Sequence, residues 1–384
     1  MSTNEGAVSK TAFYTSGSIA LFVWSCWLIS LQPTQATSII SNNWEVSLTM
    51  LFGSLIAGAT SEGGGAIAFP VFTKLLHIDP QDAKLFSLAI QSVGMTAAGI
   101  AIIAMRIRIE WRVIIWASLG GFAGMLLGSV ILAQVLPPAT VKMSFTMMAT
   151  SFAITLFALS RNINLRNERL FVCQKKEKIL LVLAGIAGGT MSGLVGNGID
   201  IITFSLMVLL FRINEKIATP TSVILMAINA IFGTILHYFF IGGFTEQIHQ
   251  YWLSAVPIVV IGAPLGAIIC CLMPRKLIVN FLLGLITVEL VTSLLLIPIS
   301  FQVASSSLII FFLFSTVYIW MYHNKSYVYS VGKIPSQKNQ TNTIFTGRKS
   351  ILEPVITTRT ADIYTKEDIS KSEETSNIFR KNKN

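Results

Sequence analysis

A run of glycine and polar residues, Gly58–Gly65, interrupts an apolar segment that begins near Val46 and ends near His77. As one helix, residues 46–76 would be about 46 Å long at about 1.5 Å per residue, well beyond the roughly 30 Å hydrocarbon core of a bilayer. The three successive glycines Gly63–Gly65 make a continuous helix still less stable. We therefore expect a re-entrant hairpin of two half-helices, with its tip buried in protein or lining a water-filled cavity.

The same pattern recurs 135 residues later, where the stretch Gly193–Asp200 separates two short apolar runs. The same shift aligns Ile78 with Ile213 without a gap. Two copies of one membrane unit, each interrupted at the same place by glycine and polar residues, are typical of transporters with broken helices. The sequence therefore predicts two membrane repeats, 46–160 and 179–297.

The composition places the chain in a lipid bilayer, because 53% of its residues are hydrophobic and only 12% are charged. The net charge of +10 comes from lysines and arginines spread over loops and the C-terminal part, so we expect no nucleic-acid partner. Histidines and cysteines show no metal-ligand spacing, and no phosphate-binding glycine motif is present. With no nucleophile–base pair visible either, we predict a protein that is not an enzyme and holds no metal or cofactor.

Polar and apolar segments divide the chain into parts. These are an N-terminal segment with a first transmembrane helix (1–45), membrane repeat 1 (46–160), a basic cytoplasmic loop (161–178), membrane repeat 2 (179–297), a last transmembrane helix (298–322) and a disordered cytoplasmic tail (323–384). The predicted fold class is an all-α polytopic membrane protein of two inverted repeats. Each repeat has a broken re-entrant helical hairpin plus three transmembrane helices, and additional helices lie at the N- and C-terminal ends.

The positive residues favour the inverted arrangement. If each broken segment is a hairpin, each repeat crosses the membrane three times and the second copy is inverted; continuous spans would make both copies point the same way. Before the tail, hairpins place 14 basic residues on one side and 3 (Lys74, Lys84 and Lys142) on the other, whereas continuous spans place 9 and 8. Because cytoplasmic loops are rich in lysine and arginine, we expect hairpins in the cytoplasmic membrane, with both termini in the cytoplasm.

The two breaks form the predicted binding site. The second half-helix of each hairpin begins with N–H groups expected to be unpaired, near Gly64–Gly65 and Gly198–Ile199. Such helix ends attract anions, and glycine lets the backbone come close to a ligand. Polar side chains on the following helices can donate to an oxyanion without carrying charge. The predicted site comprises Ser61, Glu62, Gly63, Gly64, Gly65, Gln91, Ser92, Gly196, Asn197, Gly198, Asp200 and Asn229.

Three carboxylic acids lie in or beside the apolar runs. Glu62 and Asp200 flank the two breaks, and Glu289 lies in the middle of a predicted span. A carboxylate repels an anion unless it is protonated, so these residues suggest coupling to a proton or a cation. Glu62 and Glu289 are the predicted coupling residues; the alternative is a neutral carboxyl group that is hydrogen-bonded within the helix bundle.

Other glycines recur four residues apart, in Gly120-Gly121…Gly124…Gly128 and in Gly262…Gly266. Small residues at this spacing allow two helix backbones to approach closely. We expect these glycines to serve helix packing rather than binding.

Short motifs around the breaks occur in the same order in both halves. They are Gly58…Gly63-Gly64-Gly65 with Pro70, Ile78-Asp79-Pro80-x-x-Ala83-x-x-x-Ser87, Ala218-Thr219-Pro220-Thr221-Ser222 and Gly262-Ala263-Pro264-Leu265-Gly266. Over roughly residues 46–297 the chain resembles the sulfite exporter TauE/SafE family of membrane permeases. The resemblance implies movement of sulfur-containing or other organic anions across the cytoplasmic membrane, driven by an ion gradient.

These observations predict a secondary transporter of small anions, with an anionic solute and the lipid bilayer as its partners. One alternative is a transporter of a cation or neutral solute that Glu62 and Asp200 bind directly. Another is a membrane scaffold or sensor that does not transport and acts through the tail, residues 323–384.

The orientation can be tested by cysteine labelling. With Cys26, Cys270 and Cys271 replaced by serine, we expect a cysteine at Gly243 to react with a membrane-impermeant maleimide in intact cells, because the loop 242–250 is predicted outside. The native Cys173, in the basic loop, should react only after permeabilisation. The opposite labelling pattern would contradict the predicted orientation.

Overall fold

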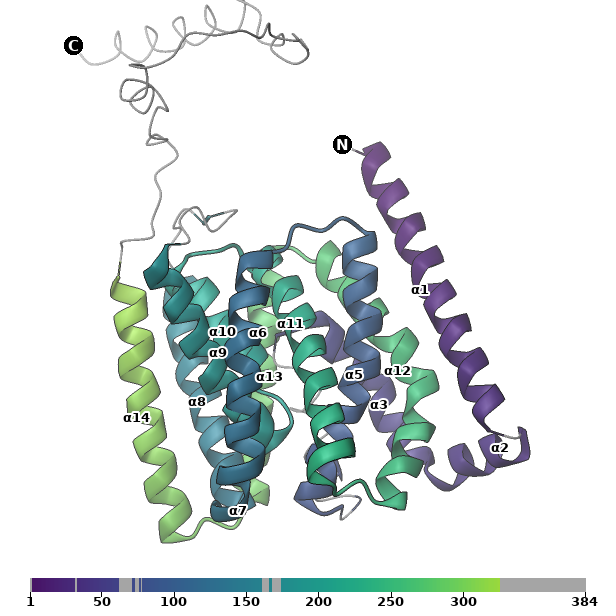
Figure 1. Cartoon of the computed structure of the whole chain (residues 1–384). Coiled ribbons are helices and arrows are strands. Elements are labelled where there is room, and N and C mark those ends of the chain that lie inside the picture. The colour runs from purple at the N-terminus through teal and green to yellow at the C-terminus, as the bar shows by residue number, and fades with distance from the viewer. Residues whose placement is uncertain are drawn as a thin grey trace, which may run out of the picture. The chain divides into compact units, whose positions relative to one another are not determined.

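A computed structural model describes residues 2–31, 33–61, 71–72, 76, 78–160, 166–167 and 174–324 (Figure 1). The α-helices are α1 (Ser2–Ser30), α2 (Pro33–Asn42), α3 (Trp44–Ala59), α5 (Pro80–Ala104), α6 (Trp111–Leu126), α7 (Ala133–Val135), α8 (Pro138–Ser160), α9 (Lys175–Val195), α10 (Ile199–Ser205), α11 (Glu215–Ile235), α12 (Glu246–Leu272), α13 (Arg275–Leu296) and α14 (Phe301–His323). Three π-helical segments extend α6, α10 and α11: η2 (Leu127–Leu132), η3 (Leu206–Leu210) and η4 (Leu236–Ile241).

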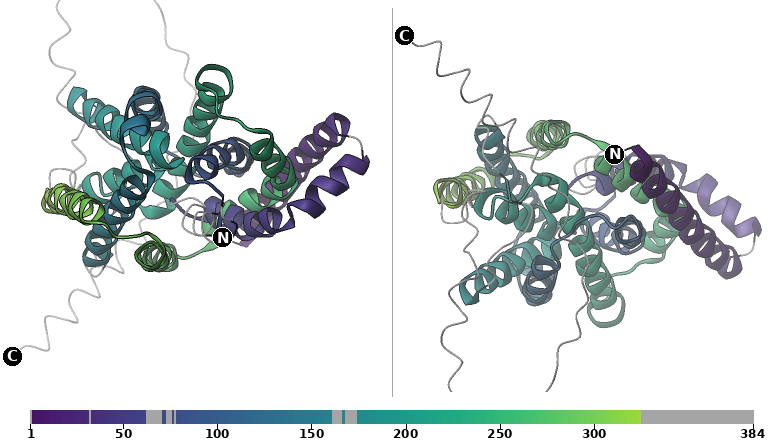
Figure 2. Two further views of the ribbon diagram at one scale, coloured as in Figure 1. Left: turned by 90° about the horizontal axis from the view of Figure 1, so that it is seen from below. Right: turned by 90° about the horizontal axis from the view of Figure 1, so that it is seen from above.

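The described residues confirm an all-helical polytopic membrane protein. Nine of their helical segments are long and apolar enough to cross a bilayer, while α3 and the segment α10–η3 are shorter. Helices α1 and α2 lie at one edge of the bundle and α14 lies at another (Figure 2). The first arm of the second hairpin differs from the prediction, because α9 is long enough for a complete span rather than a half-helix. The predicted tail lies almost entirely outside the described residues.

The second broken segment returns to the end of the bundle where it begins. Gly196 and Gly198, with φ angles of +95° and +144°, make the turn between α9 and α10. Asn167, which precedes α9, donates its backbone N–H to the Arg212 carbonyl (2.7 Å), and the Asn214 N–H donates to the Asn167 carbonyl (3.0 Å). The residues that enter the segment are therefore hydrogen-bonded to those that leave it, as in a hairpin.

A buried ion-pair cluster holds this end of the hairpin together. Glu215, at the start of α11, is fully buried and accepts from Arg166 Nη2 (2.9 Å) and Arg275 Nε (2.6 Å). Arg166 also donates to the Val208 carbonyl (3.0 Å). Burial lowers the pKa of Arg166 to about 10, against the opposing effect of Glu215, so the guanidinium keeps its charge at neutral pH. The cluster joins the loop before α9 to the starts of α11 and α13.

The first broken segment is described only in part. Val46, near the start of α3, belongs to one buried apolar cluster with Phe72 and Ile78, which precede α5. Helix α3 ends at Ala59, inside the predicted break, and the rest of the break from residue 62 lies outside the described residues. The relation of the two repeats by inversion stays a prediction.

Glycines bring helices of the two repeats into backbone contact. On α6, a Cβ atom added at Gly124 would lie 2.1 Å from the Ile186 carbonyl oxygen of α9. On α12, one added at Gly266 would lie 2.0 Å from the Leu55 carbonyl oxygen of α3. Both distances are far shorter than a van der Waals contact, so only glycine fits. The packing role expected for these glycines is confirmed.

Replacing Gly124 by alanine should destabilise the protein by about 1–3 kcal/mol, because the added methyl group forces α6 away from α9. Gly284 on α13 is the matched control, since a Cβ atom there meets nothing within 4 Å. Thermal unfolding of the detergent-solubilised variants measures the difference. A Gly124→Ala protein as stable as Gly284→Ala would contradict this account of the helix contact.

Candidate functional site

The tip of the second hairpin is hydrogen-bonded from within. The Gly198 N–H donates to Asp200 Oδ1 (2.9 Å), and the Ile199 N–H donates to Ser192 Oγ (3.1 Å). The expectation that these two N–H groups are unpaired is therefore wrong: a carboxylate two residues ahead and a hydroxyl on α9 take the place of a bound anion. Asp200 is buried, and its Oδ2 has no hydrogen-bond partner within the described part of the chain.

Helix α5 of the first repeat completes the bonding of this tip. Gln91 Nε2 donates to Ser87 Oγ (2.6 Å) and to the Gly196 carbonyl (3.2 Å). About two helical turns nearer the start of α5, Lys84 Nζ donates to the Gly193 carbonyl (3.2 Å). The structure thus brings Gln91 together with the second break, although the two are 105 residues apart.

A cavity lies against this contact. Its polar lining comes from α3, α5, α8 and the turn after α9, namely Ser54, Ser87, Gln91, Lys142 and Asn197. Apolar side chains including Met50, Phe72, Phe86 and Val259 line the rest. Two predicted site residues, Gln91 and Asn197, therefore share one cavity with side chains of the first hairpin.

The other predicted residues do not line this cavity or lie outside the described residues. Ser61 is buried just past the end of α3, and Ser92 Oγ donates to the Ala89 carbonyl (2.7 Å). Asn229 is buried on α11 close to Gly121 and does not line the cavity. Glu62, Gly63, Gly64 and Gly65 lie outside the described residues, so their roles stay predictions.

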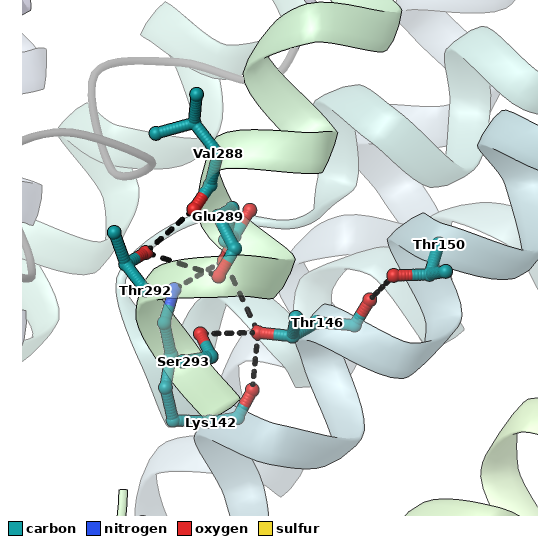
Figure 3. Close-up of polar contacts among 7 residues, drawn as sticks. All are labelled: Lys142, Thr146, Thr150, Val288, Glu289, Thr292 and Ser293. Atoms are coloured by element: carbon teal, nitrogen blue, oxygen red, sulfur yellow. Dashed lines mark hydrogen bonds and ion pairs between the residues drawn. The ribbon is translucent and has the colours of Figure 1, made fainter. Parts of the chain in front are cut away.

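Glu289 forms a buried ion pair with Lys142 (Figure 3). Their Oε1 and Nζ atoms are 2.5 Å apart, and the side chains are 1% and 4% exposed. Thr146 Oγ1 donates to the same carboxylate oxygen (3.4 Å) and lies 3.1 Å from Ser293 Oγ. Two oppositely charged groups this deep in a membrane helix bundle mark a functional position more often than a structural one.

Lys142 also lines a second cavity, together with Lys84. Pro80 and Pro138 contribute to this cavity, which lies where α5 and α8 begin. Sequence reasoning counted these two lysines only as orientation signals and missed them as site residues. Their position inside apolar runs was the available signal, because a lysine in a membrane segment is costly unless it has a partner or a cavity.

A multi-pass helical bundle with a broken helix, beside a cavity that several polar side chains help to line, is the architecture of a membrane transporter. The family model described as Sulfite exporter TauE/SafE matches residues 46–292, from α3 into α13. The protein belongs to the sulfite exporter TauE/SafE family, which is a family of membrane transporters and not of enzymes. No curated protein and no solved structure matches the chain.

Replacing Gln91 by methionine should destabilise the protein by about 1–3 kcal/mol, because the buried Gly196 carbonyl loses its donor. Gln81→Met is the matched control at an exposed position of the same helix, where we expect a change within about 0.5 kcal/mol. Thermal unfolding in detergent measures both variants. Equal stability of the two proteins would show that the Gln91 contact does not hold the tip.

Proposed function

We propose that the protein is a secondary transporter of a small anion, sulfur-containing or organic and of the sulfite or sulfonate type. The observation that carries this proposal is the cavity lined by Gln91, Asn197 and Lys142. An ammonium group and side-chain amides are donors suited to an oxyanion. The apolar remainder of the lining excludes water and strengthens such contacts.

The lysine favours an anion over a cation as the substrate. Lys142 lines this cavity whereas no carboxylate of the described residues does, and Asp200 already accepts a hydrogen bond from Gly198 at the hairpin tip. Glu62 and Glu289 remain the proposed groups for coupling to a proton or cation gradient. The proposed location is the cytoplasmic membrane, with both termini in the cytoplasm and lipid around the bundle.

Transport is tested with the purified full-length protein in proteoliposomes. Uptake and efflux of radiolabelled sulfite, sulfate, thiosulfate and taurine are measured with and without a pH gradient. We expect gradient-dependent movement of at least one of the three inorganic anions, or of taurine, a zwitterion whose sulfonate group can make the same contacts. Movement of none of them, by a protein that is folded and inserted, would favour a cation, a neutral solute or a scaffold role.

Two variants connect transport to the cavity. Ser87→Phe should reduce the flux by about tenfold or more, because its ring occupies the volume that the anion needs. Thr287→Phe is the matched control on the exposed face of α13 and should transport normally.

Deleting residues 325–384 should leave transport intact, whereas a scaffold acting through its tail would lose its activity.

A further inference from the structure

Lys142 is the cation shared by the two cavities, and Glu289 neutralises it. Both side chains are almost fully buried. In the low-dielectric interior of a membrane protein, a neutral pair is stable, but an unbalanced charge is costly. Any anion that enters either cavity therefore meets a lysine whose charge is already matched by a carboxylate.

The charges around this ion pair disfavour the binding of an anion next to Lys142 while Glu289 is ionised. The carboxylate of Asp200 on α10 lies within electrostatic reach of Glu289. Lys84, the other cation of the second cavity, is held by the Gly193 carbonyl. A bound anion next to an ionised Glu289 would add negative charge opposite one ammonium group, with Asp200 close by.

We propose that the transported anion and the Glu289 carboxylate compete for Lys142, and that the anion binds when Glu289 takes up a proton. The step balances as follows: the carboxylate gains one proton and becomes neutral, the Lys142–Glu289 ion pair breaks, and an ion pair between Lys142 and the anion forms. A monovalent anion then leaves no charge unmatched, and a divalent anion such as sulfate leaves one negative charge instead of the two that it would leave beside an ionised Glu289. This inference rests on the proposed function and identifies its coupling ion as a proton moving with the anion.

The surroundings of Glu289 can hold its protonated form. A neutral carboxyl group needs an acceptor for its O–H, and the hydroxyl groups of Thr146 and Ser293 lie beside it (Figure 3). Thr146 Oγ1 also lies 3.1 Å from the Lys142 carbonyl, which can accept the threonine's hydrogen once the protonated Glu289 donates to Thr146. The same pocket therefore suits the carboxylate and the carboxylic acid.

The proposal predicts opposite pH responses in two variants. In the unaltered protein, one proton taken up per anion lowers the apparent Kd by up to about tenfold for each unit that the pH falls. Glu289→Gln removes the competitor, so binding should be tight and independent of pH. The double variant K142M/E289Q removes both charges and leaves no unpaired one, and its binding should be at least about tenfold weaker.

Binding is measured on the full-length protein in detergent, as the rise in melting temperature with sulfate or thiosulfate between about pH 5 and about pH 8. These two probes keep their charge over that range, so any slope comes from the protein. Lys142→Arg keeps the charge and should retain binding, which separates a loss of charge from a loss of fold.

The outcomes separate this inference from the proposed function. If anion binding by Glu289→Gln depends on pH as steeply as binding by the unaltered protein, the inference is overturned. If the pH dependence is lost in Asp200→Asn instead, the proton is assigned to Asp200. If anions cross proteoliposomes but neither probe stabilises Glu289→Gln more than the unaltered protein at neutral pH, the inference alone fails. If no anion moves or stabilises any variant, both proposals fail.

Discussion

Backbone polar groups at a helix break inside a membrane must be hydrogen-bonded, and this requirement organises the centre of the protein. In lipid, an unpaired carbonyl or N–H group has no water to bond. The Gly196 carbonyl is satisfied by Gln91 and the Gly198 N–H by Asp200. Because the donor for the first of these bonds comes from the other repeat, the break cannot form correctly until the two halves have packed together.

The same requirement explains why polar side chains and a cavity lie together. Side chains that satisfy the break must reach it through an otherwise apolar bundle, and they leave space next to the turn that tightly packed helices would fill. Gln91 and Asn197 serve both purposes, since they lie at the break and line the cavity. The residues that stabilise the helix break are therefore also the residues that present polar groups to the cavity.

Much of the fold could be predicted from the sequence, because glycine spacing and apolar run lengths depend on local geometry. The re-entrant path of the second hairpin and the packing glycines are of this kind. The pairing of Lys142 with Glu289 was not predicted, because its two members lie 147 residues apart and on helices with no sequence pattern that relates them. The bonding of the Gly198 N–H was missed for another reason: Asp200 was weighed only as a charge, although an aspartate two residues ahead is also a local acceptor.

The glycine contacts have a consequence for movement. Helices whose backbones touch cannot slide past one another without a clash, so α6 moves with α9, and α3 moves with α12. Each of these pairs takes one helix from each repeat. In the proposed transporter, the rigid bodies of an alternating-access cycle would then be these mixed pairs rather than the predicted repeats, so that each repeat would be divided between two bodies.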